Sequence, residues 1–259
     1  MTLFLLPGLG FALLVALPLA ALAYRAVAAG DLLDSLHKPI VHEALRLSML
    51  TSGLTLAITV ALGTPLAYTL ARASFPGKRV LDTLVDLPIV LPPVVAGVAL
   101  LMAFGRRGLL GEPLRRAGVE LAFTTGAVVI AQVFVSAPFY IRAAKAGFQS
   151  VDDTLEGIAY TLGASRWRAF VRVTLPLALP SLASGAVLCW ARALSEFGAT
   201  MMFAGNFRGR TQTMPLAILT AMESDLDAAL AIAVILLAAS FLVLLLIRTV
   251  GRGDAGASR

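Results

Sequence analysis

Six long apolar segments constrain the fold of this 259-residue chain more than any other feature. Each is long enough to cross a bilayer as a helix, which takes about 20 apolar residues. They cover approximately residues 3–23, 45–70, 84–104, 122–141, 177–203 and 228–247. Composition agrees, because 59% of the residues are hydrophobic and only 14% are charged, unlike soluble domains. The sequence predicts a polytopic membrane protein with one transmembrane domain over residues 1–259.

A helical bundle is the expected fold class. Lipid offers no water to backbone amides, so a spanning segment must form a helix or join a closed barrel. The apolar segments lack the strict alternation of polar and apolar residues that barrel strands show. We therefore expect an all-α protein with six transmembrane helices and both termini in the cytoplasm. Lys and Arg divide almost evenly between the two sides, so charge gives this orientation little support.

The net charge of +6 would indicate nucleic-acid binding in a soluble chain. In a membrane protein, basic residues flank the spans beside anionic lipid heads, so we expect the bilayer and no nucleic acid as their partner. Cys189 is the single cysteine, and His37 and His42 lack a zinc-type spacing. We expect no metal site, no cofactor and no catalytic residues.

Two short helices are expected in the longest polar connection, between the fourth and fifth spans. Asp153 can cap the first helix, with Glu156 reaching back from the third position, and Gly163 can end it. Ser165 can cap the second helix, which the restriction on residues before Pro176 should end.

Leu155, Ala159 and Leu162 fall on one face of the first of these helices. They give an apolar edge to a segment that is otherwise too polar to enter the membrane. The spacing supports two interpretations equally. The edge packs against a partner protein, or it packs against the chain's own helix ends.

The second half of this connection carries a recognisable spacing. Ten residues after Gly163 comes Val173, followed by Leu175 and Pro176. This arrangement resembles the cytoplasmic signature loop of ABC importer permeases, in which a glycine is followed by nine residues, an aliphatic residue, any residue, and Leu-Pro.

The first half of the family motif is matched less closely. Ala159 matches its second alanine, whereas Ile158 replaces the first alanine and Gly157 stands at the motif glutamate. Glu156, one position earlier, is the nearest acid.

Three further stretches narrow the resemblance, which covers nearly the whole chain. Residues 86–97, 192–200 and 203–215 look like the molybdate and tungstate branch of oxyanion importer permeases. Sulfate permeases share much of the second stretch, while the third is closer to the molybdate type. The implied function is translocation of molybdate or tungstate. A sulfate importer permease is one alternative, and an ion-coupled secondary transporter is another, although the latter usually needs repeat halves and several intramembrane acids.

The resemblance also implies an assembly in the cytoplasmic membrane of a bacterium or archaeon. It consists of a permease homodimer, two ATPase subunits and an extracytoplasmic oxyanion-binding protein. The sequence has no Gly-x-x-x-x-Gly-Lys-Ser/Thr phosphate-binding loop, so we expect a transport subunit and not an enzyme. In this assembly residues 142–174 form the coupling loop, and the residues expected to serve ATPase coupling are Leu155, Glu156, Ala159, Leu162 and Gly163.

Three prolines and a glycine interrupt the third apolar segment, at Pro88, Pro92, Pro93 and Gly97. Proline removes an intrahelical hydrogen bond and clashes with the preceding turn, so this helix should be broken or begin irregularly. The break can serve as a hinge near the transport path, or the prolines can simply precede the helix start at the membrane face.

Arg192 and Glu196 are charges within the fifth apolar segment, and their spacing places them on one face of a helix. Because a charge in lipid is costly, this face should look into the bundle or a watery cavity. Thr200 and Asn206 add hydrogen-bonding groups nearby. The group can line the anion path, or Arg192 and Glu196 can form a structural pair at the dimer seam.

Six arginines lie in the loops that this assignment places outside. They can steer the binding protein or the anion toward the entrance, or they can be solvated loop charges. They are Arg106, Arg107, Arg115, Arg116, Arg208 and Arg210.

Overall fold

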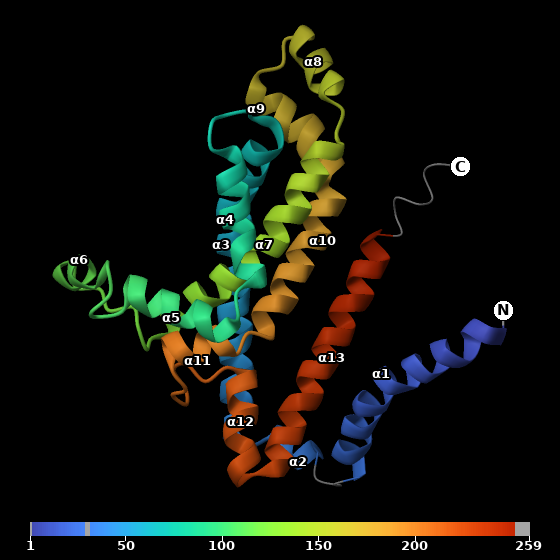
Figure 1. Cartoon of the computed structure of the whole chain (residues 1–259), viewed down its shortest axis with the longest axis vertical. Coiled ribbons are helices and arrows are strands. Elements are labelled where there is room, and N and C mark those ends of the chain that lie inside the picture. The colour runs from blue at the N-terminus through green and yellow to red at the C-terminus, as the bar shows by residue number, and fades with distance from the viewer. Residues whose placement is uncertain (1, 29–31, 252–259) are drawn as a thin grey trace.

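The computed structural model describes residues 2–28 and 32–251, and these residues are helical almost throughout, without a β-strand (Figure 1). Four stretches in this part of the chain are long and apolar enough to cross a membrane: Leu6–Ala26, Pro39–Arg72, Thr125–Ser150 and Arg166–Leu194. Pro93–Phe104 and Leu226–Leu242 are shorter apolar helices. The predicted all-α membrane fold is confirmed.

The centre of the bundle is α7 (Thr125–Ser150), which packs between α3 (Pro39–Arg72) and α10 (Leu175–Leu194). Small residues allow this close approach. A Cβ added to Gly185 of α10 would lie 2.6 Å from the Ala143 side chain of α7, and one added to Gly147 would lie 2.5 Å from Ser181. Without a hydrophobic driving force between helices in lipid, such close packing is what holds them together.

Polar side chains also join these helices. The Gln132 side chain on α7 accepts a hydrogen bond from Thr55 of α3 at 3.1 Å and donates one to the Ala193 carbonyl of α10 at 3.1 Å. Trp190 donates from its indole nitrogen to the Ser52 hydroxyl at 3.0 Å. These buried bonds fix how α3, α7 and α10 lie against one another.

Around this centre lie α1 (Thr2–Ala28), α2 (Leu32–Leu36), α12 (Met214–Ser224) and α13 (Leu226–Gly251). Figure 1 shows α13 running from the α12 end toward the α8 end, with α1 beside it in the opposite direction. Arg252 and Arg259, which the predicted orientation places in the cytoplasm, lie outside the described residues.

The predicted third span is broken into α4 (Lys78–Val90) and α5 (Pro93–Phe104). Leu91 and Pro92 between them have extended backbone conformations. Pro88 is buried inside α4, and Pro93 is the first residue of α5, where its missing N–H leaves no hydrogen bond unmade. Pro92 and Pro93 therefore mark the interruption, whereas α4 continues past Pro88 to Val90.

The predicted fifth span is wrong as one continuous helix. α10 ends at Leu194 and α11 runs from Gly198 to Ala204. The Glu196 carboxylate accepts a hydrogen bond from the Ala199 amide at 2.8 Å and so begins a new helix. Hydropathy does not detect a side chain that competes for backbone amides, so the apolar run looked continuous.

The two helices that follow these breaks cross each other closely. A Cβ on Gly97 of α5 would lie 2.6 Å from Met202 Cβ and 2.9 Å from the Ala199 carbonyl oxygen of α11. A Cβ on Gly198 would lie 2.7 Å from Pro93 Cβ. The α5–α11 crossing is therefore glycine-dependent from both sides.

The connection between α7 and α10 contains α8 (Asp153–Thr161), α9 (Arg166–Ala169) and the π-helical turn η1 (Phe170–Thr174). Ser165 caps α9 through the Arg168 amide, as predicted. Asp152, and not Asp153, caps α8 by accepting from the Thr154 amide at 2.9 Å. The local spacing is compatible with either acid, and only Asp152 has the extended backbone of a cap.

The expected helix end before Pro176 is also wrong, because η1 leads directly into α10. The wide turn lets the Leu175 amide bond to the Phe170 carbonyl, five residues back. A π turn of this kind relieves the clash and the lost hydrogen bond that proline causes inside an α-helix. The helix therefore continues through Pro176.

Candidate functional site

α8, which lies at one end of the molecule (Figure 1), carries exposed apolar side chains on one face. Leu155 is 40% exposed, Ile158 55% and Leu162 82%. Ala159 is only half-buried, and α8 contains no buried residue. The leucines of this face therefore remain available at the surface and are not buried against the chain's own helix ends. Ile158 was missed as a member because it lies on the edge of the predicted stripe.

The Glu156 side chain points away from this face, into the chain. Its carboxylate accepts a hydrogen bond from the Thr174 hydroxyl at 2.5 Å and lies 3.5 Å from the Arg72 guanidinium. It does not form the predicted capping box, because its oxygens are engaged by other helices. The partners of Glu156 could not be identified from the sequence, since Arg72 belongs to a helix that is far away in the sequence although it is adjacent in the fold.

Two glycines shape α8. Gly163 has φ +81, a left-handed conformation that ends the helix as predicted. At Gly157 an added Cβ would meet no atom within 4 Å, so this position opens outward. The nearest acid, Glu156, and the open position 157 thus lie on different sides of the helix, because successive helical residues are about 100° apart.

The Arg192 and Glu196 side chains form the predicted ion pair, 2.7 Å apart. Glu196 is 1% exposed and lies in the break between α10 and α11, not in the middle of a span. Thr200 is buried in α11, and its hydroxyl has no hydrogen-bond partner among the described residues. Asn206 is directed elsewhere, donating to the Thr220 hydroxyl of α12 at 2.9 Å. The structure therefore joins Arg192 and Glu196 directly but ties Asn206 to α12.

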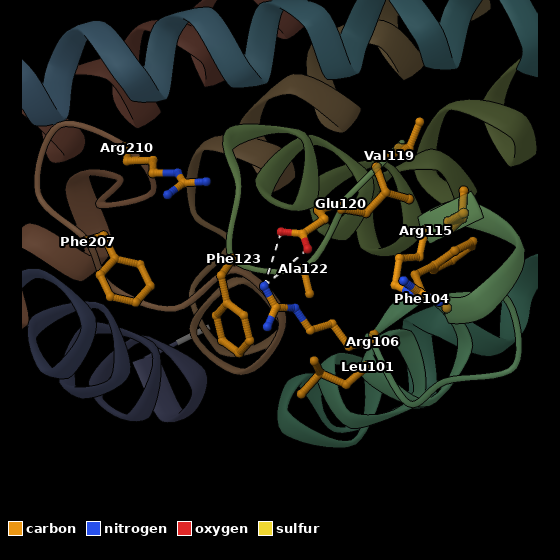
Figure 2. A pocket seen from close by; sticks show the side chains of 14 residues that line it. Leu101, Phe104, Arg106, Arg115, Val119, Glu120, Ala122, Phe123, Phe207 and Arg210 are labelled. Atoms are coloured by element: carbon orange, nitrogen blue, oxygen red, sulfur yellow. Dashed lines mark hydrogen bonds and ion pairs between the residues drawn. The ribbon is translucent and has the colours of Figure 1, made fainter. Parts of the chain in front are cut away.

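A cavity of about 420 Å³ lies beyond α5, beside the short helix α6 (Gly111–Arg116). Figure 2 shows Phe104, Phe123 and Phe207 among its lining residues, with Arg106 directed at Glu120. These two charged groups are 3.1 Å apart, whereas no ion pair of Arg210 occurs in the described part of the chain. The cavity is missed by sequence reasoning because its aromatic lining comes from three separate segments, the end of α5 and two loops.

Pairing distinguishes the other outer arginines. Arg115 and Arg116 both pair with Glu112, at 2.9 and 3.0 Å. Arg208 pairs with Glu43 at 2.8 Å, which joins the α11–α12 connection to α3. Four of the six outer arginines therefore have a carboxylate partner, and the three carboxylates offset half of the charge of the six.

A comparison with known protein families identifies the family to which the chain belongs. The model of the family described as "Binding-protein-dependent transport system inner membrane component" matches residues 60–253, which include the α8 face and both helix breaks. The chain belongs to this family. As an inner membrane component it is a multi-pass membrane protein and a transport subunit, not an enzyme. The alternative of an ion-coupled secondary transporter is thereby removed.

Similar inner membrane components are known from bacteria and archaea. The chain is 44% identical to the molybdenum transport system permease protein ModB of Mycobacterium bovis, over 93% of this chain and 90% of that protein. It is 41% identical to the molybdate/tungstate transport system permease protein WtpB of Thermococcus kodakarensis, over 98% of each. The resemblance noticed in the sequence is confirmed.

Solved structures agree on the fold of this inner membrane component. A chain of a bacterial ABC transporter that imports the acidic polysaccharide alginate superposes with a TM-score of 0.75 and 18% identity, covering 100% of this chain and 95% of that one. A chain of the MetNI methionine ABC transporter gives a TM-score of 0.60 and 15% identity, covering 82% and 96%. At these identities the likeness establishes the fold alone.

Proposed function

We propose that this chain is the permease subunit of an ABC importer that carries molybdate or tungstate across the cytoplasmic membrane of a bacterium or archaeon. The observation that carries the proposal is the 41–44% identity to molybdenum and molybdate/tungstate permeases over more than nine-tenths of the chain. The whole chain forms one transmembrane domain in this proposal.

The α8 face docks on an ATPase subunit. Leu155, Ile158 and Leu162 leave an apolar stripe in the water-exposed end of the bundle, and such a stripe is stabilised by burial against a partner. Gly163 sets where α8 stops, and Ala159 fills the edge of the stripe. One chain offers one such face, so an importer with two ATPase subunits requires a permease homodimer.

This docking fixes the orientation in the membrane. If α8 meets an ATPase, the α8 end is cytoplasmic, and the cavity beside α6 belongs to the other side. Both termini are then cytoplasmic in the proposed topology. The extracytoplasmic oxyanion-binding protein docks near the arginines around that cavity, whose positive field draws acidic groups.

The two breaks have different roles in the proposal. Pro88, Pro92, Pro93 and Gly97 form a hinge region whose movement is limited by the α5–α11 crossing. Arg192 and Glu196 form a structural pair, because Glu196 is buried and also holds the first turn of α11. Thr200 supplies a buried hydroxyl in α11, and Asn206 ties the segment after α11 to α12.

Reconstitution decides between the anions. The chain, its ATPase and its binding protein are placed in proteoliposomes, and ATP-dependent uptake is measured with molybdate, tungstate and sulfate in competition. Uptake of molybdate or tungstate that excess sulfate leaves unaffected is expected. Preferred uptake of sulfate would make the chain a sulfate permease, and uptake without ATP would contradict an ABC importer.

A further inference from the structure

One carboxylate of α8 is held by several helices at once. Glu156 accepts hydrogen bonds from the Thr174 hydroxyl at 2.5 Å, the Tyr160 hydroxyl at 3.3 Å and the Tyr68 hydroxyl at 3.4 Å. The Arg72 guanidinium lies 3.5 Å away. We call these five residues the Glu156 cluster. They come from α3, α8 and η1, so the cluster joins segments that are far apart in the sequence.

The two charged groups of the Glu156 cluster are largely shielded from water, whereas Tyr160 is exposed. The Glu156 side chain is 12% exposed and that of Arg72 is 17% exposed. A charge-assisted bond in such surroundings is stronger than an exposed ion pair, and losing one partner leaves the other charge uncompensated. The cluster is therefore stiff compared with the surface pairs elsewhere in the molecule.

Arg72 extends the connection beyond Glu156. Its guanidinium donates to the Val151 carbonyl at the end of α7, at 2.9 Å, and also pairs with Asp153 at the start of α8. The end of α3 thus grips the end of α7 and the first turn of α8. The backbone does not connect α3 directly to α8, because α4, α5, α6 and α7 lie between them in the sequence. The contacts of Arg72 and Glu156 therefore supply the direct connection.

α8 has two stripes offset by two residues, which places them on roughly opposite sides of the helix. The inward stripe consists of Asp153, Glu156 and Tyr160. Glu156 and Tyr160 belong to the Glu156 cluster, and Asp153 pairs with its Arg72. Leu155, Ile158 and Leu162 form the outward stripe. Both follow the i, i+3, i+7 spacing of one helix face. A force applied to the outward stripe is therefore applied to a helix whose other side holds α3.

We propose that Glu156 is a positioning residue that makes α3 follow the movement of α8. The proposal rests on the proposed function, in which an ATPase moves α8. Through the backbone α8 is connected to α7 and α10, and through the Glu156 cluster it is connected directly to the end of α3. Without the cluster, α8 is a nine-residue helix between the short connection at Val151 and Asp152 and the turn at Gly163, and it can shift while the end of α3 stays in place. ATP turnover would then continue with less transport.

The test measures anions transported per ATP hydrolysed by the reconstituted importer. Glu156→Ala removes every bond of the carboxylate, and we expect the ratio to fall about tenfold, the effect of one charge-assisted hydrogen bond on a two-state equilibrium. Glu156→Gln keeps an acceptor oxygen and should lower the ratio less. Glu223→Gln, an exposed acid of α12, is the control and should leave the ratio unchanged.

A purely structural role predicts something different. Loss of assembled complex lowers transport and ATP turnover in proportion, so the ratio stays constant, and a constant ratio in both Glu156 variants would overturn the proposal. If Glu156→Ala does not assemble, Tyr68→Phe replaces it, because this change removes one hydrogen bond and keeps the ring that packs on Phe148. A ratio unchanged in Tyr68→Phe and Glu156→Gln would then be decisive against it.

A second measurement does not depend on transport. Hydrogen exchange of the α8 amides is compared in the whole membrane-embedded protein with and without Glu156→Gln. Exchange several-fold faster in the variant is expected, since charged hydrogen bonds oppose local opening. Equal exchange would overturn the cluster as a tether. Absence of ATP-dependent uptake by the unaltered chain would contradict the proposed function and leave this readout intact.

Discussion

The Arg192 guanidinium lies 2.7 Å from the Glu196 carboxylate at the point where α10 ends, and the same carboxylate caps α11. Glu196→Gln removes the charge from a buried pair. We expect a loss of about 2 kcal/mol in stability and less assembled complex, with uptake per assembled complex unchanged. Thermal unfolding and uptake are measured separately.

The control for this pair is Glu120→Gln, which breaks the exposed pair with Arg106. It should change stability by no more than about 0.5 kcal/mol, because exposed ion pairs contribute little. Normal assembly of Glu196→Gln with lost uptake would instead place Arg192 and Glu196 in the anion path.

The α5–α11 crossing predicts an intolerance to added volume. Gly97→Ala would place its Cβ 2.6 Å from Met202 Cβ, so the two helices must separate. We expect a loss of about 1–3 kcal/mol, the usual effect of overpacking. Gly53→Ala in α3 is the matched control, since its Cβ would meet nothing within 4 Å and alanine favours helix. Equal melting temperatures for the two variants would contradict the crossing.

The α8 face predicts a loss of association without a loss of folding. Leu162 is 82% exposed, so Leu162→Ser removes few contacts within the chain. Co-purification with the ATPase should fall several-fold while the melting temperature of the permease alone stays constant. Leu109→Ser changes an equally exposed leucine beside α6 and should not affect co-purification. Undiminished association of Leu162→Ser would argue against docking at this face.

The connection between α12 and α13 predicts a response to acid. The Lys38 ammonium bonds to the Asp225 carboxylate at 2.7 Å and lowers the pKa of Asp225. A carboxyl with a lowered folded-state pKa stabilises the fold above its unfolded pKa, and this contribution disappears as the pH falls through the folded pKa. The melting temperature should therefore drop below about pH 4.

Asp225→Asn should flatten part of that drop, because asparagine does not titrate and can still accept from the Ala228 amide that Asp225 caps. Lys38→Met should also flatten it by returning the pKa of Asp225 toward its ordinary value. Identical pH profiles for all three proteins would exclude this pair as a source of acid sensitivity.

The outer cavity predicts a salt-dependent encounter with the binding protein. Arg210 borders this cavity and has no ion pair within the described residues, so its charge is open to a partner. Arg210→Gln should slow association several-fold at low salt and much less at high salt. Arg115→Gln, whose charge is already paired with Glu112, should have a smaller effect. Salt-independent association would remove the steering role.

The sequence predicted what depends on composition and local chemistry. Apolar length gave the helical membrane fold, Ser165 and Gly163 marked real helix boundaries, and the prolines marked the break before α5. Each of these features needs only neighbouring residues to form.

Two of the features that were missed depend on local hydrogen bonds that hydropathy does not register, and a third depends on a partner far away in the sequence. Glu196 ends the fifth apolar run because its side chain finds the Ala199 amide, and Pro176 stays within a helix because η1 absorbs it. Glu156 turns inward because it accepts a hydrogen bond from Tyr68, which lies 88 positions earlier in the sequence but next to it in the fold. Spacing within one segment contains no information about such contacts.

The α5–α11 crossing has a consequence for how this chain can vary. Gly97 and Gly198 lie on opposite sides of one helix contact, although they are far apart in the sequence. A Cβ atom at either position requires the two helices to move apart. The two positions therefore form one mutational unit. A shorter side chain at Met202 or Pro93 would not make room, because the atoms in the way are the Cβ atoms of these residues and the Ala199 carbonyl oxygen, so the helices themselves must separate.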